Sequence, residues 1–418
     1  MREGRLLPGA RLPTVRDLAG RLGVCPATVA SAYRSLGGRG VVLAAGRRGT
    51  RVAGTPALRT RIEAPVPEGV RDLASGNPDP ALLPALGPAL RRIDAAHHLY
   101  GQPNPVPELL TLVARELAAD GIPTDSLAVV SGALDGIERV LEVHLRPGDR
   151  IAVEDPGFTS VLDLCAAKGL VPVPVELDDE GPLPDSLADA LAAGAEALVL
   201  TPRAQNPTGA ALSAGRVKAL RSVLRSAPRV LVIEDDHAGA VAGAPARTLC
   251  DARRERWAVV RSVAKALGPD LRLGFLCGDA ETLGRVEGRQ RMGLRWVSYL
   301  LQRTVLALLT DAGARRAVRR AARCYAERRE ALLRALASRG VGASGRSGMN
   351  VWVPVPEEGT VAQRLLAKGF AVTPGERFRI RSAPAIRITT SALGPGDADR
   401  VADAVASTLG GGAPAQVA

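Results

Sequence analysis

Short apolar runs alternate along most of the chain with longer stretches in which apolar residues recur every three or four positions. Each run has three or four β-favouring residues and ends in a loop with polar residues or glycine. Runs of this kind are typical of buried strands, and helical stretches between them indicate parallel connections. The pattern predicts a mainly parallel α/β sheet with ligands bound at its strand ends. The runs cover residues 128–130, 151–153, 198–200, 230–233 and 257–260.

The first 52 residues have a different pattern. A capping-box start at Thr14 opens one short helix, Gly23 ends it, and Pro26 at a first helical position opens a second helix. Two short helices with a tight glycine turn predict a helix-turn-helix. Their apolar faces comprise Leu18, Ala19 and Leu22 in the first helix and Val29, Ala32, Tyr33 and Leu36 in the second.

A β-hairpin follows these helices, because residues 41–43 and 50–52 are β-favouring and flank a turn that contains arginines. We interpret it as a wing whose arginines contact phosphates or the minor groove, while small polar side chains of the second helix approach base edges. The alternative is a basic helical hairpin that binds nothing specific. The predicted DNA contacts are Arg11, Thr14, Arg16, Thr28, Ser31, Arg34, Arg47, Arg48 and Arg51.

Composition and charge support this division. The net charge is +12, and residues 1–60 hold eleven arginines against Glu3 and Asp17, which gives this segment +9 and points to a polyanionic partner. We expect a DNA-binding domain at residues 1–54, a linker rich in Pro, Arg and Glu at 55–71, a large domain at 72–410 and a tail at 411–418.

No signal core or membrane-length apolar run is visible, so we expect a soluble cytoplasmic protein without a membrane partner. The five scattered cysteines lack metal-ligand spacing, and we expect them to be buried free thiols. The histidines also lack such spacing, and we predict no metal site.

Lys265 and Arg272 carry the strongest chemical signal. Only four lysines occur against fifty-one arginines, and Lys265 lies in a segment of apolar residues and glycine. A desolvated amine can form a Schiff base with an aldehyde, and a guanidinium seven residues later can bind a phosphate. One alternative is a solvated lysine beside a surface arginine. Another is the Ser-x-x-Lys site of penicillin-binding enzymes with Ser262 as nucleophile, but their other motifs are missing.

The other strand ends supply matching groups. Ser131, Gly132 and Ala133 precede a helix, so their N–H groups can bind a phosphate. Phe158 offers an aromatic face for a heterocycle, although core packing is the commoner role of phenylalanine.

Two further strand ends carry polar side chains. Asn206 lies in a proline-fixed turn and offers an amide. Asp235 follows the fourth strand, where a carboxylate can keep a pyridine nitrogen protonated; the alternatives are a metal site or plain loop acids.

Residues 70–410 resemble the fold type I aminotransferases, in the Asn206-Pro207-Thr208-Gly209 motif, the acid at 235 and the Ser-x-x-Lys motif with an arginine seven residues on. The resemblance implies that fold with a small C-terminal α/β part, pyridoxal 5′-phosphate as cofactor, Lys265 as the internal aldimine lysine and Asp235 beside the pyridine nitrogen. It also implies that Asn206 contacts the ring hydroxyl, Phe158 stacks on the ring, Ser262 and Arg272 bind phosphate, Tyr100 reaches the partner subunit's phosphate, and Arg387 binds a substrate carboxylate.

The N-terminal segment resembles the winged helix of GntR-family regulators, through Leu7-Pro8-Gly9, Leu12-Pro13-Thr14 and Thr28-Val29 with Ala32-Tyr33. A winged helix fused to an aminotransferase-like domain is the layout of the MocR subfamily. Only residues 1–6 precede the Pro-Gly turn, so we expect most of the first helix of that module to be missing. Cys25 and Pro26 also replace the polar residues that usually open the recognition helix.

His237 departs from the aminotransferase pattern, because a tyrosine normally contacts the ring hydroxyl from this position. Imidazole can donate the same hydrogen bond, but we expect its charge to vary near neutral pH.

Two functions follow from these resemblances. The favoured one is a homodimeric, pyridoxal phosphate-dependent regulator of operator DNA, in which an amine or amino acid displaces Lys265 by aldimine exchange. The alternative is an active class I/II aminotransferase with a vestigial N-terminal arm.

Overall fold

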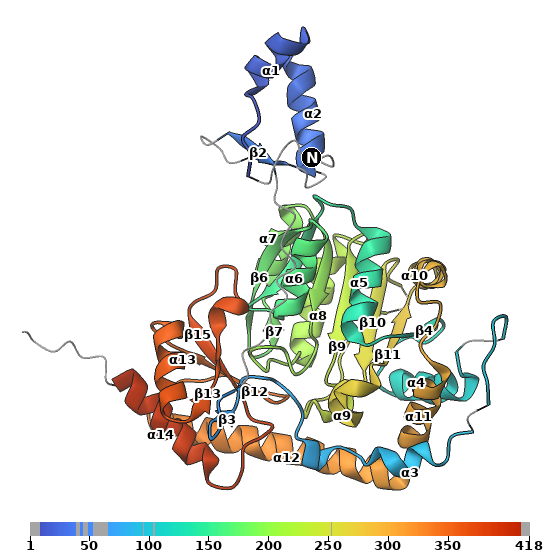
Figure 1. Cartoon of the computed structure of the whole chain (residues 1–418), viewed down its shortest axis with the longest axis vertical. Helices are drawn as coiled ribbons and strands as arrows, with labels where there is room; N and C mark the ends of the chain where they lie inside the picture. The colour runs from blue at the N-terminus through green and yellow to red at the C-terminus, as the bar shows by residue number, and fades with distance from the viewer. Residues whose placement is uncertain are drawn as a thin grey trace, which may run out of the picture.

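Figure 1 shows the computed structural model of the protein, which comprises a small N-terminal module and a large domain. The described residues are 9–38, 42–44, 49–52, 66–94, 96–102, 105–251 and 253–410.

The N-terminal module contains the predicted helix-turn-helix and wing. Helix α1 spans Val15–Leu22, α2 spans Pro26–Gly38, and the antiparallel strands β1 and β2 span Val42–Ala44 and Thr50–Val52. Thr14 caps α1, because its hydroxyl accepts a hydrogen bond of 3.2 Å from the backbone N–H of Asp17. Among the described residues of this module, Ala19, Val29, Val42 and Val52 are buried.

Two residues of the predicted apolar faces are exposed to solvent. Leu22 is 62% exposed and Ala32 is also exposed, so the prediction that both pack on the inner face was wrong. Leu22 is the last residue of α1, next to the left-handed Gly23 that ends the helix. Arg47, Arg48 and the side chains of Ser31 and Arg34 lie outside the described part of the chain.

An eight-stranded sheet forms the centre of the large domain, in the order β4-β11-β10-β9-β8-β5-β6-β7. The strands β5, β6, β8, β9 and β10 are parallel, β11 is antiparallel to both of its neighbours, and β7 is antiparallel to β6. All five predicted runs are strands, and the mainly parallel sheet is confirmed. The bounds are β4 Leu127–Val130, β5 Arg150–Asp155, β6 Val171–Asp178, β7 Gly181–Pro182, β8 Ala195–Leu200, β9 Leu231–Asp236, β10 Trp257–Ser262 and β11 Gly274–Gly278.

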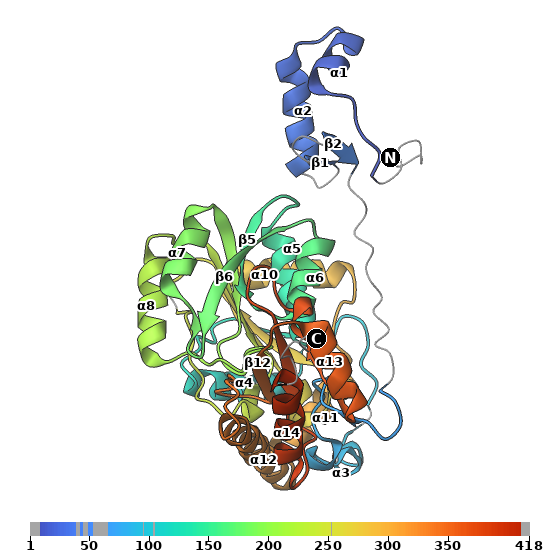
Figure 2. The same ribbon diagram turned by 90° about the vertical axis from the view of Figure 1, so that its left-hand side faces the viewer.

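Helices cover both faces of this sheet (Figure 2). One core contains residues of α5, α6 and α10, and the core on the opposite face contains residues of α4, α7, α8, α11 and α12. Alternating side chains of each strand fill the two cores, which explains why the strands read as continuous apolar runs. The helices are α4 Pro107–Ala119, α5 Ala133–His144, α6 Thr159–Ala167, α7 Pro184–Ala192, α8 Ala214–Arg225, α10 Ala280–Met292, α11 Tyr299–Thr310 and α12 Ala312–Ala337.

The long helix α12 leads into a C-terminal α/β part with its own core. Its three-stranded sheet has the order β12-β15-β14, and a separate short pair joins β13 to β3 in parallel. Strand β3 contains Arg71, so the end of the predicted linker segment is already hydrogen-bonded to the C-terminal part. The bounds are β3 Arg71–Asp72, α3 Leu86–Leu90, β12 Asn350–Pro354, α13 Glu358–Ala367, β13 Phe370–Ala371, β14 Thr373–Pro374, β15 Ala385–Thr389 and α14 Asp397–Gly410.

Three cysteines of the large domain, Cys165, Cys250 and Cys277, are buried free thiols, as predicted. Cys25 is exposed and Cys324 is only half-buried, so the prediction was wrong for these two positions. Among the described helices, none is both long and apolar enough to cross a membrane.

Candidate functional site

A cleft of about 560 Å³ opens where the ends of β8, β9 and β10 meet the start of α5 and the C-terminal part. It brings together the predicted residues Ala133, Phe158, Asn206, Asp235, His237, Ser262, Lys265, Arg272 and Arg387.

Lys265 lies on the short helix α9, Ala264–Leu267, which directly follows β10. Its ammonium group donates a hydrogen bond of 2.6 Å to the carbonyl oxygen of Gly76. Desolvation and the charge of Arg387 lower the pKa of Lys265 to about 8, against the opposing effect of Asp235. The lysine therefore has the desolvated amine that the sequence indicated.

Asp235 is the last but one residue of β9 and is 2% exposed, and its carboxyl Oδ1 atom has no hydrogen-bond partner among the described residues. Burial raises the pKa of Asp235 to about 7, and the nearby charges of Asp236 and Glu154 add to this effect. An unsatisfied buried acceptor is costly unless a ligand supplies a donor. A protonated ring nitrogen would be such a donor.

Asp236 has the opposite environment, although it is the next residue. It accepts two hydrogen bonds from Arg203, at 2.8 and 2.9 Å, and one from Arg261 at 2.7 Å. Burial alone would raise the pKa of Asp236, but these bonds and charges outweigh burial and hold the pKa at about 2. Asp120, at the end of α4, completes the network through Arg261 at 2.7 Å. The network ties the end of β9 to the loop after β8, to β10 and to the end of α4.

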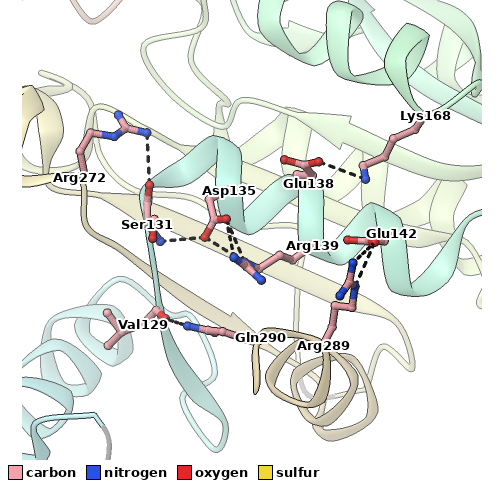
Figure 3. Close-up of polar contacts among 10 residues, drawn as sticks. All are labelled: Val129, Ser131, Asp135, Glu138, Arg139, Glu142, Lys168, Arg272, Arg289 and Gln290. Carbon is pink, nitrogen blue, oxygen red and sulfur yellow. Dashed lines mark hydrogen bonds and ion pairs between the residues drawn. The ribbon is translucent and has the colours of Figure 1, made fainter. Parts of the chain in front are cut away.

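The predicted phosphate corner lies at the first turn of α5 (Figure 3). Gly132 has φ 101°, and a Cβ atom there would come within 3.1 Å of an Arg272 guanidinium nitrogen. Arg272 has φ 41° and donates to the carbonyl of Ser131 at 3.2 Å. A left-handed arginine is uncommon and costs free energy, so its surroundings hold it in place. The glycine and the helix N-terminus leave room for an anion beside this guanidinium.

Asp135 also lies in this first turn, and Figure 3 shows how its charge is balanced. It accepts a hydrogen bond from the Ser131 backbone N–H at 2.9 Å and forms an ion pair with Arg139 at 2.9 Å. The carboxylate is therefore neutralised next to the anion corner. Ser262 contributes differently, since its hydroxyl accepts a bond from the Ala264 N–H at 3.1 Å.

Asn206 and Arg387 contact each other on the C-terminal side of the cleft. Arg387, on β15, donates to the Asn206 carbonyl oxygen at 3.1 Å and to Thr373 at 3.1 Å, and it also bonds the carbonyl of Ala74. Its guanidinium carbon lies 4.9 Å from the centre of the Phe378 ring. The peptide bonds before Pro156 and Pro207 are cis.

Of the neighbouring arginines, Arg377 also lines the cleft, whereas Arg379 forms an ion pair with Glu358 at 2.8 Å. A negatively charged ligand group would therefore meet Arg387 and Arg377.

His237 lies half-buried in the cleft. Burial and the charge of Lys265 lower the pKa of His237 to about 4. The expectation that its charge varies near neutral pH was wrong, because the cleft keeps this imidazole neutral there.

Tyr100 lies outside the cleft and is 78% exposed, with Trp296 and Arg295 beside its ring. In the module, the described candidate DNA contacts Arg11, Thr14, Arg16, Thr28 and Arg51 are all exposed.

Sequence reasoning missed Arg203, Arg261 and Asp120. They are far apart in the chain, and the available signal was weak: an arginine stands near the end of each of the strands β8 and β10. It also missed strands β6 and β11. The first is interrupted by two prolines, and the second lies between two glycines that weaken a strand pattern.

Residues 68–405 match the family model of aminotransferase class I and II, and residues 1–52 match bacterial regulatory proteins of the gntR family. The fold agrees with solved structures. An archaeal alanine:glyoxylate aminotransferase superposes with a TM-score of 0.74 at 22% identity, covering 82% of this chain and 91% of the other. The class is therefore a GntR-type DNA-binding module followed by an aminotransferase class I and II domain.

Relatives narrow the class further. The vitamin B6 salvage pathway transcriptional repressor PtsJ of Salmonella typhimurium is 40% identical over 403 residues, 96% of this chain and 93% of that protein. The pyridoxine biosynthesis transcriptional regulator PdxR of Corynebacterium glutamicum is 28% identical over 344 residues, 78% of this chain and 74% of that protein. This chain belongs to the MocR subfamily of GntR-family transcriptional regulators. It is a DNA-binding transcriptional regulator, and the alternative of an aminotransferase with a vestigial arm is not favoured.

Proposed function

We propose that this chain is a homodimeric repressor of vitamin B6 salvage genes whose affinity for DNA changes when pyridoxal 5′-phosphate occupies the cleft. The regulated genes are proposed from the 40% identical relative, whose name states that role. The ligand is proposed from the cleft itself. A regulator of this kind would match salvage to the supply of the finished cofactor.

The observation that carries the proposal is that Lys265 and Asp235, whose carboxyl Oδ1 atom has no hydrogen-bond partner among the described residues, line the same cleft. Lys265 would supply an amine that sheds its proton near pH 8. Asp235 would hold a pyridinium proton, while Gly132 and Arg272 would accommodate the phosphate. When bound, the cofactor supplies an aldehyde that condenses with amines and a ring that withdraws electrons.

Signal transmission would run through the segment that follows the linker. Lys265 donates to the carbonyl of Gly76, and Arg387 donates to that of Ala74. The same segment continues β3, which pairs with β13, and Thr373 also donates to Ala74 at 3.0 Å. A ligand that engages Lys265 or Arg387 would remove hydrogen bonds from the part of the chain joined to the DNA-binding module. The two binding events are then coupled in free energy.

The proposed homodimer is supported by large apolar side chains that are exposed at the end of α3, at Tyr100 and from the end of α10 to the start of α11. Large apolar side chains seldom gather on a surface without a partner. In a dimer, Tyr100 would complete the phosphate corner of the partner subunit, and two modules would bind paired half-sites. The exposed residues are Leu90, Leu99, Tyr100, Met292, Leu294 and Leu300.

The test is a titration of the ligand-free full chain with pyridoxal 5′-phosphate, followed by absorbance and by binding to DNA from the upstream regions of vitamin B6 salvage genes. We expect an absorbance change that depends on Lys265 and a parallel change in DNA affinity. The matched control is Lys218→Ala, which removes a lysine outside the cleft. Ligand binding with no change in DNA affinity would contradict the proposal.

A second candidate effector is an amino acid that reaches the bound cofactor. The cleft offers Arg387 and Arg377 to its carboxylate. Adding amino acids to the cofactor-loaded protein, with DNA affinity as the readout, separates this candidate from a response to the cofactor alone. Fast, sustained transamination with no effect on DNA binding would support neither.

A further inference from the structure

The two halves of α12 differ in how their arginines are paired. In the second half, Arg328 forms an ion pair with Asp79 at 2.9 Å, and Arg334 pairs with Glu330 at 3.9 Å. Among the described residues, no arginine in the first half of α12 forms such a pair. Within the described part of the chain, no ion pair or side-chain hydrogen bond involves any of five exposed arginines, which are Arg315, Arg316, Arg319, Arg320 and Arg323.

These five residues share one face of the helix, because at 3.6 residues per turn they lie within about 140° of one another around the helix axis. They are called the arginine face here. Four of them line a shallow cavity of about 510 Å³ together with the small residues Gly313 and Ala317. The cavity is therefore lined by four arginine side chains and two small residues of one helix.

This placement is unfavourable in the isolated protein. Like charges three and four residues apart repel each other on a helix. Cations in the first turns also oppose the positive end of the helix dipole. A bound polyanion would relieve both effects.

We infer that the arginine face is a second DNA-contacting surface, which binds backbone phosphates outside the bases read by the winged helix. This inference rests on the DNA-binding function described above. Guanidinium groups bind phosphates with paired hydrogen bonds. From Arg315 to Arg323 the helix rises about 12 Å, which corresponds to roughly three or four phosphates along one DNA strand.

Charge supports DNA as the occupant, because the arginine face of α12 is cationic and DNA is a polyanion. The segment that follows the linker runs beside this helix, where Asp79 contacts Arg328 and Arg92 contacts Asp311 at 2.7 Å. In Figure 1 the helix lies along the lower edge of the large domain, on the side away from the N-terminal module, so a duplex held by the module must be long to reach it. Because the N-terminal modules bind DNA, DNA is the polyanion that we expect at the arginine face.

The test compares full-chain R316Q/R319Q/R320Q with the parent on arbitrary-sequence duplexes of about 20 and about 60 base pairs, the shorter one being about two helical turns. On the long duplex, the triple variant should bind more weakly, and the slope of log affinity against log salt should fall by about two to three. On the short duplex it should match the parent. The control R225Q/R229Q/R364Q removes equal charge from exposed arginines elsewhere in the large domain.

Arginine labelling of the parent protein gives a second readout that does not depend on a variant. Long DNA should protect the α12 peptide from phenylglyoxal. Equal behaviour of the triple variant and the control would overturn the inference while leaving DNA binding by the module intact. Protection by phosphatidylglycerol vesicles but not by DNA would also overturn it. If the full chain binds neither duplex, both this inference and the DNA-binding function fail.

Discussion

The cleft of the large domain and the surface of the N-terminal module differ in where their polar side chains find partners. In the cleft, Arg387, Lys265 and Asn206 already bond to other parts of the same chain. In the module, the candidate DNA contacts Arg16 and Thr28 are exposed. The cleft is built by internal contacts, and the module presents side chains to an external partner.

This difference determines how substitutions in the two regions should behave. A change in the cleft alters buried charges and therefore both folding stability and ligand binding. A change on the surface of the module should alter DNA binding with little effect on stability. The predictions below are ordered by the size of the expected effect, and each would weaken or sharpen this contrast.

The largest effect is expected from Asp236→Asn. This substitution removes the negative charge of Asp236, so that Arg203 and Arg261 lose their shared buried partner. The loss should lower the free energy of unfolding by about 3 to 5 kcal/mol. Because the folded pKa is lowered to about 2, this stabilisation is present above the unfolded pKa near 4 and is lost as pH falls towards 2. Urea unfolding at several pH values measures it. An unchanged midpoint at pH 7 would contradict the network.

The neighbouring substitution Asp235→Asn is the matched control and should have the opposite sign. The folded pKa of Asp235 is raised to about 7, so ionisation destabilises the ligand-free protein increasingly from pH 4 to pH 7. A rise of the pKa from about 4 to about 7 corresponds to about 4 kcal/mol, so the amide should stabilise the ligand-free protein by up to about 4 kcal/mol at pH 8, and by nothing below pH 4. It should also weaken binding of pyridoxal 5′-phosphate. Destabilisation at pH 8 would show that the carboxylate has a partner.

Arg272→Ala should weaken pyridoxal 5′-phosphate binding by about 10- to 100-fold, the usual range for losing a charge-assisted contact. Equilibrium dialysis measures the change. Pyridoxal without the phosphate tests the cause, because its affinity should be nearly unaffected. Equal losses for both ligands would place the phosphate elsewhere.

On the module, Arg16→Gln should lower DNA affinity about fivefold at physiological salt and reduce the salt slope by about one. The thermal midpoint should stay the same, because Arg16 is exposed and donates no side-chain hydrogen bond to any described residue. A clear loss of stability without a change in salt slope would show that Arg16 has a structural role. It would contradict the difference between the cleft and the module surface.

The smallest effect is expected from R316Q/R319Q/R320Q in the absence of DNA. Removing the like-charge pairs on α12 should raise stability by on the order of 1 kcal/mol at low salt, and the gain should vanish at high salt. Glutamine has nearly the helix propensity of arginine, so propensity does not mask the change. Thermal unfolding at two salt concentrations measures it, and a loss of stability at low salt would contradict the repulsion.

Much of this structure was predictable from local sequence. The apolar runs identified five strands of the sheet, and Thr14 and Pro26 gave the starts of the two module helices. The motifs around Asn206 and Lys265 identified residues that the structure brings into one cleft. These features depend on residues that are adjacent or on the order of parallel strands.

The remaining features depend on contacts between distant segments. Arg203 pairs with Asp236, and Asp120 pairs with Arg261, only after the chain has folded. No sequence spacing relates these four residues. The neutral state of His237 follows from burial beside Lys265, which composition does not show. The local pattern of α1 also could not show that Leu22 lies exposed.

The central claim is that occupation of the cleft changes DNA binding by the module. The most direct measurement is the DNA affinity of the full chain, with and without saturating pyridoxal 5′-phosphate, for the parent and for Lys265→Ala. The account predicts that the ligand changes the affinity of the parent by about fivefold or more, the lower end of usual coupling energies, and that Lys265→Ala loses most of this response. Equal affinities of the parent with and without bound ligand would contradict it.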